Sequence, residues 1–228
     1  MTDTILLVLV LLPALIVSIV FHEVAHGYVA KLLGDPTAQE RRRLSLNPLR
    51  HVDPVGTLLV PGAMALFGGP IFGWAKPVPV NQRRLNHPRR DMMVVAVAGP
   101  ATNIVLAAFG AILIGLIYPG YDLLQDDLPW GLIGLVNFLF INIFLAFFNL
   151  LPIPPFDGSH IFEGLLPRVW ARQYRKLRPV GLALFAAIIA ISWFFPDFGI
   201  IENVVWPPVL WAFNHFVAIS GAVAGLIG

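Results

Sequence analysis

Long apolar runs separated by short polar stretches are the main pattern in this 228-residue sequence. Each run approaches the roughly 20 residues that an α-helix needs to cross a hydrocarbon core about 30 Å thick. The pattern indicates an all-α polytopic membrane protein with about five transmembrane helices. They are predicted at residues 4–33, 92–118, 130–151, 179–195 and 204–226.

Two other segments have a different pattern. Residues 55–75 are apolar but interrupted by proline and glycine. Irregular backbone at membrane depth persists only against protein or a wet cavity, so we interpret this segment as a re-entrant or interfacial hairpin. A sixth, broken span is the alternative interpretation. Residues 160–177 are predicted to form a short interfacial helix whose basic side chains face lipid head groups.

The basic residues predict the orientation in the membrane. All fifteen Lys and Arg lie in residues 31–90 and 168–178, whereas the opposite connections carry only acidic residues. By the positive-inside rule, both basic segments are cytoplasmic. Five helices then alternate without conflict, with the N-terminus outside and the C-terminus cytoplasmic. A sixth span through 55–75 would break this alternation, so the hairpin is favoured. We expect the protein in the plasma or inner membrane of a cell.

The composition supports a membrane protein and restricts its chemistry. The chain is 57% hydrophobic and 12% charged, more apolar than a soluble domain of this size could bury. Cysteine is absent, so any bound metal must be held by His, Asp or Glu. The N-terminus lacks the basic region of a signal peptide, and we expect the first helix to be retained.

The first helix ends in a group of polar residues, His22-Glu23-Val24-Ala25-His26. On a helix, the two imidazoles lie about one turn apart on one face, with a carboxylate beside them. Such a pair can hold Zn²⁺ while Glu23 serves as base for a water on the metal. Ionisable residues within a membrane are functional candidates, although two unrelated histidines at a helix end are the alternative. At 1.5 Å per residue, His22 lies roughly 26 Å from the outer end, just inside the cytosolic boundary.

A catalytic zinc usually takes three protein ligands, and Asp157 is the best candidate for the third. It follows a proline-rich break after the third helix, which also ends at the cytosolic face. The alternative is that Asp157 caps the next helix. Four other histidines and Glu163 are weaker candidates, predicted as turn, surface, interfacial or interhelical residues. These histidines are His51, His87, His160 and His215.

Asn103 and Asn149 are polar residues near helix ends. They are candidates to orient a substrate or to stabilise an oxyanion. Hydrogen bonding between helices is an equally good interpretation.

Several motifs together resemble the site-2 protease family of intramembrane zinc metalloproteases (peptidase M50). The resemblance covers roughly residues 20–163. The motifs are His22-Glu-Val-Ala-His26, Gly34-Asp-Pro-Thr-Ala, Leu46-Asn-Pro-Leu-Arg-His-Val-Asp-Pro-Val-Gly-Thr-Leu, Gly73-Trp-Ala-Lys-Pro-Val-Pro-Val-Asn, Ala98-Gly-Pro-Ala-Thr-Asn103 and Asn149-Leu-Leu-Pro-Ile-Pro-Pro-Phe-Asp157-Gly158.

The resemblance implies that His22, His26 and Asp157 bind one Zn²⁺ per chain and that Glu23 is the catalytic base. It also implies a catalytic core of three helices that cleaves transmembrane proteins within the bilayer. We therefore expect a catalytic core over residues 1–163 and an accessory part over 164–228. Family members with an inserted PDZ domain or a nucleotide-binding domain differ from this chain, and no nucleic-acid partner is expected.

Two other function classes compete with hydrolysis. A metal-ion transporter could use intramembrane His and Asp as a transit site. The second class is an inactive membrane scaffold, which would use neither of these residue types for a function. Glu23 discriminates between them, because transport requires no base at that position. A further hypothesis is that the broken segment 55–75 receives an unwound substrate strand by edge pairing.

Overall fold

The computed structural model of the chain describes residues 2–59, 75–120, 128–194, 199 and 203–227. Its described elements are all helical, and no strand occurs among these residues. Most of the expected hairpin at 55–75 lies outside the described residues, so that interpretation stays a prediction. The predicted all-α polytopic class is confirmed.

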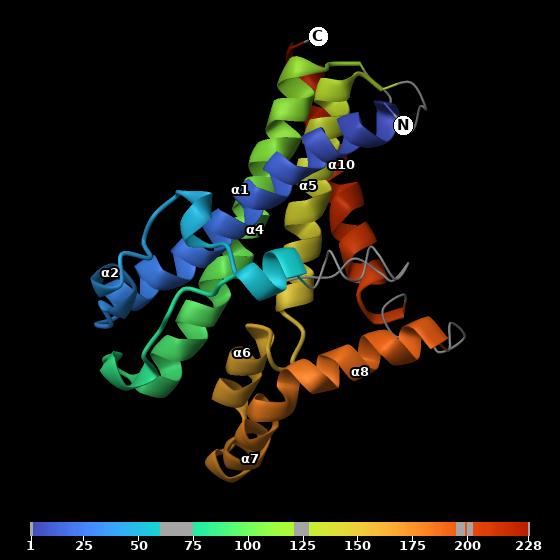
Figure 1. Cartoon of the computed structure of the whole chain (residues 1–228). Coiled ribbons are helices and arrows are strands. Elements are labelled where there is room, and N and C mark those ends of the chain that lie inside the picture. Colours follow the sequence, from blue (N-terminus) through green and yellow to red (C-terminus); the bar gives the residue numbers. More distant parts are fainter. Residues whose placement is uncertain (1, 60–74, 121–127, 195–198, 200–202, 228) are drawn as a thin grey trace.

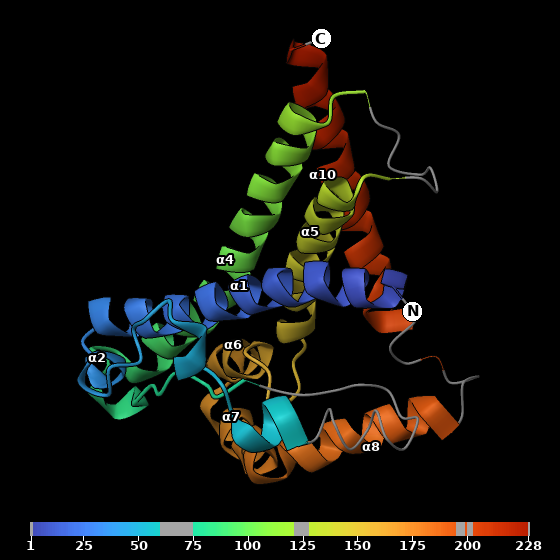
Figure 2. The same ribbon diagram turned by 45° about the horizontal axis from the view of Figure 1, so that its top comes forward.

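Four helices of the described residues are long and apolar enough to cross a membrane. They agree with four of the predicted spans. These helices are α1 (Thr2–Leu32), α4 (Pro88–Ile117), α5 (Trp130–Asn149) and α10 (Trp206–Ile227). Figures 1 and 2 show α4, α5 and α10 side by side, with α1 crossing α4 and α5.

Small residues on α4 allow the bundle to pack closely. Ala107 and Ala111 are fully buried, and they repeat at four-residue spacing with Gly115 along one face. A side chain at Gly115 would collide with Ser220 and Val223 of α10, so these helices approach at backbone distance. Close packing of small residues is how helices associate where no hydrophobic effect drives them together. The result is a buried core between α4, α5 and α10.

Short helices fill the connections on the basic side of the chain. Between α1 and α4 they are α2 (Thr37–Glu40), η1 (Pro48–Arg50), η2 (Pro54–Leu59) and η3 (Gln82–Arg84). After α5 they are α6 (Gly158–Leu165), α7 (Arg168–Tyr174), η4 (Arg175–Val180) and α8 (Gly181–Phe194). The single interfacial helix predicted at 160–177 is thus divided, because Pro167 separates α6 from α7.

The fifth predicted span, 179–195, differs from the prediction. Its helix, α8, is described over 14 residues. Both views show α8 lying crosswise to the bundle instead of along it.

The position of α8 changes the direction of the last helix. The charge pattern predicted α10 antiparallel to α4. Instead the two run parallel, because Gly115 near the end of α4 lies beside Ser220 near the end of α10. The C-terminal ends of both helices therefore lie at the same end of the bundle (Figure 1).

Candidate metal centre

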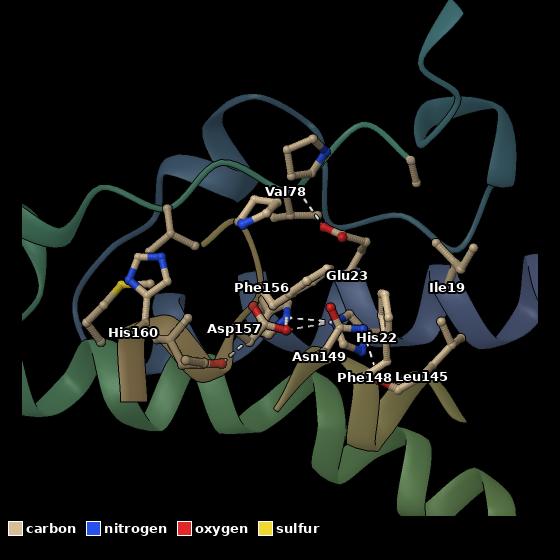
Figure 3. A pocket seen from close by; sticks show the side chains of 18 of the residues that line it. Ile19, His22, Glu23, Val78, Leu145, Phe148, Asn149, Phe156, Asp157 and His160 are labelled. Carbon is tan, nitrogen blue, oxygen red and sulfur yellow. Dashed lines mark hydrogen bonds and ion pairs between the residues drawn. The ribbon is translucent and has the colours of Figure 1, made fainter. Parts of the chain in front are cut away.

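The two histidines of α1 and the aspartate after α5 converge on one point. His22 Nε2 and His26 Nε2 are 3.1 Å apart, and each lies 3.1 Å from Asp157 Oδ2. The imidazole rings meet edge to face, and both are buried. Figure 3 shows the Asp157 carboxylate pointing at His22. These are the three residues that the sequence proposed as ligands.

Hydrogen bonds at the far nitrogens fix the two imidazoles. His26 Nδ1 lies 2.7 Å from the carbonyl oxygen of Val95, which can only accept, so the proton is on Nδ1. His22 Nδ1 lies 2.5 Å from Asn103 Oδ1. The Asn103 amide nitrogen donates to Asn142 Oδ1 and Ser18 O, so its oxygen is the acceptor for His22. Both Nε2 lone pairs therefore face the shared point.

This donor set fits a zinc ion. Two imidazole lone pairs and a carboxylate oxygen within 3.1 Å of one another repel unless a cation lies between them. A tetrahedral Zn²⁺ with bonds of about 2.0–2.1 Å holds its ligand atoms roughly 3.3 Å apart, close to the spacing here. Bonds from the other ring nitrogen to an oxygen are typical of histidines that bind a metal.

Close approach of α4 is needed to build this centre. Gly99 faces the two imidazoles, and a Cβ at that position would lie 2.6 Å from His22 Nε2. The same Cβ would also collide with His26 Nε2. The absence of a side chain at Gly99 lets α4 supply Val95 O and Asn103 Oδ1 to the rings.

Asp157 is held by the segment that follows α5. It lies at the N-cap position of α6, but its side chain makes no capping hydrogen bond, so the capping alternative is not realised. Phe156 beside it is buried against Phe148 and Phe185, with ring centroids 4.6 and 4.9 Å away.

Glu23 faces a cavity of about 650 Å³ that the three ligand residues also line. Its Oε2 accepts a 2.6 Å hydrogen bond from the backbone N–H of Val78. Val78 belongs to an extended stretch that is anchored nearby, since Lys76 N–H donates to His51 O. Figure 3 shows Glu23 directed to the side of Val78, apart from the imidazoles. The carboxylate is therefore oriented but does not pair with the histidines.

The two candidate asparagines have different positions. Asn103 is fully buried between helices and does not line the cavity. Asn149 does line it, and its amide nitrogen donates to Leu145 O at 2.9 Å. Asn142, which was not predicted as a site residue, completes the buried chain of hydrogen bonds to His22. Its signal was a polar residue in the middle of a spanning helix.

The other histidines lie mostly away from the centre. His51 is buried in a turn and bonds Ser45 O, while His87 begins α4 with an exposed ring. His215 bonds Trp211 O one turn back on its own helix, not across helices. His160 lines the cavity and takes a hydrogen bond from Arg178 at Nδ1. Burial and the charge of Arg178 lower the pKa of His160 to about 4, so its ring is neutral.

Glu163 differs from the expectation of a solvated residue. Its side chain is buried and pairs with Arg175 at 2.7 Å and with Arg178 at 2.5 Å. A buried carboxylate needs such partners, because an unpaired charge in this position would be costly. Arg175, which the sequence assigned to lipid head groups, is therefore engaged within the protein.

Comparisons with known proteins identify a matching family and related sequences. Residues 122–192 match the family described as "Peptidase family M50". The chain is 39% identical to "Putative zinc metalloprotease YwhC" of Bacillus subtilis (strain 168), over 86% of this chain and 84% of the relative. It is 31% identical to "Putative zinc metalloprotease Rip2" of Mycobacterium tuberculosis (strain ATCC 25618 / H37Rv), over 91% and 76%. No solved structure matches.

Proposed function

The chain belongs to peptidase family M50, and from this premise we propose that it hydrolyses membrane proteins at a zinc centre held by His22, His26 and Asp157. The observation that carries the proposal is the triangle of three ligand atoms, each 3.1 Å from the others. Both imidazoles present a lone pair to it, as zinc ligands must.

Glu23 is proposed as the general base. When bound, zinc lowers the pKa of a coordinated water and polarises the scissile carbonyl. The Glu23 carboxylate accepts the water proton and passes it to the leaving amine. The hydrogen bond from Val78 N–H directs the carboxylate while leaving its second oxygen available.

The asparagines are proposed to act differently. Asn103 is a positioning residue, since its oxygen bonds His22 and its burial keeps it from substrate. Asn149 lies where a substrate carbonyl can be reached, and one N–H of its amide is already used by Leu145 O. We retain for Asn149 the role of orienting substrate or stabilising the oxyanion.

We propose that the basic side of the chain faces the cytosol of a plasma or inner membrane, as the positive-inside rule requires. The N-terminus of α1 then lies outside. With α10 parallel to α4, the C-terminal end of α10 is also outside, in place of the cytoplasmic C-terminus expected from five spans. The substrates are membrane-anchored proteins cleaved near the cytosolic face.

Glu23→Gln tests the proposal. We expect the variant to keep about one zinc per chain by elemental analysis, because Glu23 is not a ligand, and to lose cleavage. Cleavage is followed by quantitative proteomics of membrane fragments released by the wild type. Glu40→Gln is the matched control, since that carboxylate pairs with Arg84 away from the cavity and should not affect cleavage.

Two results would overturn the proposal that the chain is a zinc protease with Glu23 as its base. Fragments released equally by Glu23→Gln would exclude Glu23 as the base. Zinc or another divalent ion crossing proteoliposomes at the wild-type rate in Glu23→Gln would instead favour a transporter, because transport needs no base.

A further inference from the structure

A second cavity, of about 540 Å³, adjoins the metal centre. Val80, Gln82 and Arg178 line both cavities. An extended chain that lies across the metal ligands can therefore continue into the second cavity without leaving the protein surface. We call this second cavity the arginine cavity, because four guanidinium groups line it: Arg41, Arg83, Arg175 and Arg178.

No carboxylate lines the arginine cavity among the described residues, and the acidic groups nearby are already engaged. Glu163 pairs with two of the lining arginines. Glu40 takes two hydrogen bonds from Arg84. Asp35 is fully buried and accepts the backbone N–H groups of Thr37 and Asn81. The cavity therefore keeps a net positive charge, carried mainly by the unpaired Arg41 and Arg83.

Two of the lining arginines still have donors to offer. Arg41 and Arg83 make no side-chain hydrogen bond or salt bridge with any described residue. Guanidinium donors bind carboxylates through strong, charge-assisted hydrogen bonds.

The two cavities differ in chemistry on the two sides of the metal ligands, so they define the direction in which a substrate chain can bind. Figure 3 shows Ile19, Leu145 and Phe148 on one side of Asp157 and His160 on the other. Arg178 bonds His160, so the arginine cavity adjoins the His160 side. A substrate thus meets apolar residues on one side of the metal ligands and arginines on the other. The membrane part of a substrate fits the first side, and its cytosolic flank fits the second.

Resting on the proposed function, we propose that the arginine cavity binds carboxylate side chains in the cytosolic flank of the substrate, beside the scissile bond. Most transmembrane segments carry Lys and Arg in that flank. The cavity repels such flanks and attracts acidic ones, so it excludes the bulk of membrane proteins from cleavage. Repulsion of wrong partners is a general source of specificity.

Binding to zinc-loaded Glu23→Gln protein tests this without hydrolysis. Three peptides share one apolar helix and differ only in a four-residue cytosolic flank of Glu, Gln or Lys. In neutral detergent at low salt, fluorescence anisotropy should give a Kd about tenfold lower for the Glu flank than for the Gln flank, and weakest binding for Lys. The preference should fade at high salt, which screens exposed charges.

The same measurement with added substitutions locates the effect. Adding Arg41→Gln and Arg83→Gln should abolish the preference for Glu, while both arginines that hold Glu163 stay in place. Arg172→Gln is the control, because Arg172 is an exposed arginine of α7 that does not line the cavity.

Equal Kd values for the Glu and Gln flanks, or a preference that survives Arg41→Gln/Arg83→Gln, would overturn the proposal. A third result would also overturn the proposal: peptide binding that does not depend on the flank, but that changes when phosphatidylglycerol is added to the micelle and does so only when Arg41 and Arg83 are present. That result would assign the cavity to a lipid head group. These Kd values are measured without hydrolysis, so they do not depend on whether the protein cleaves its substrate. Failure of the proposed function would therefore be distinguishable from failure of the proposed carboxylate binding.

Discussion

Gly99→Ala adds one methyl group at the closest approach of α4 to the metal ligands. The new Cβ would lie 2.6 Å from both Cε1 and Nε2 of His22 and would also collide with His26 Nε2. Contact at 3.4 Å would be ordinary, so the His22 ring must move by about 0.8 Å. Zinc ligands tolerate displacements of only about 0.2 Å.

The rings have little freedom to move away. His22 is tied to Asn103 and His26 to Val95 through their Nδ1 atoms, so a shift stretches one of these bonds or the contact with Asp157. Overpacking by one methyl group typically costs about 1–3 kcal/mol. If that cost falls on the zinc-bound state, the affinity for zinc decreases roughly 5- to 150-fold.

The assay is competition for zinc between the purified, detergent-solubilised protein and a chelator of known affinity. Gly221→Ala is the control, because it makes the same change in a helix with no atom within 4 Å of the new Cβ. Both variants gain helix propensity, by about 1 kcal/mol. Only Gly99→Ala should lose zinc. Wild-type zinc affinity in Gly99→Ala would refute the close approach and the ligand assignment built on it.

Three other changes test separate parts of the site. Asn103→Leu removes the acceptor of one imidazole and should weaken zinc binding about 10- to 100-fold in the same competition assay. Val78→Pro removes the N–H that directs Glu23 and should lower kcat about tenfold or more at unchanged zinc content, measured by steady-state cleavage. His160 has a pKa of about 4 when folded and 6.5 otherwise, so the unfolded chain binds the extra proton. Stability is therefore complete above pH 6.5 and falls by up to about 3 kcal/mol as the pH decreases to 4, and His160→Gln should flatten this profile in thermal unfolding.

The convergence of His22, His26 and Asp157 was predictable from the sequence because two independent patterns agreed. The spacing of His22 and His26 put both rings on one helix face. The charge pattern placed the end of the first helix, near His26, and the end of the third, before Asp157, at one membrane face. His26 and Asp157 come within 3.1 Å of each other because a break lets the chain turn back after α5. The break is the proline-rich stretch before Asp157.

The groups that orient the ligands were not predictable in the same way. Asn103 is one of several polar residues on spanning helices, and helical periodicity does not say which of them faces α1. Asn103 reaches His22 because α4 lies very close to the two imidazoles at Gly99, and this closeness arises only when the helices are packed. Glu163 shows the same limitation, since its burial depends on Arg175 and Arg178 returning from α7 and η4.

The role of α8 depends on contacts that hydropathy does not report. An apolar run of this length can cross a membrane or can pack against protein, and the charge rule counts only crossings. Here the start of α8 is fixed to the loop of the third ligand. A side chain at Gly181 would collide with Pro154, and Phe185 packs on Phe156 with centroids 4.9 Å apart. Because Phe156 is next to Asp157, α8 supports the position of a proposed zinc ligand. Its apolar surface is thus explained in part by that contact, and the direction of α10 follows from it.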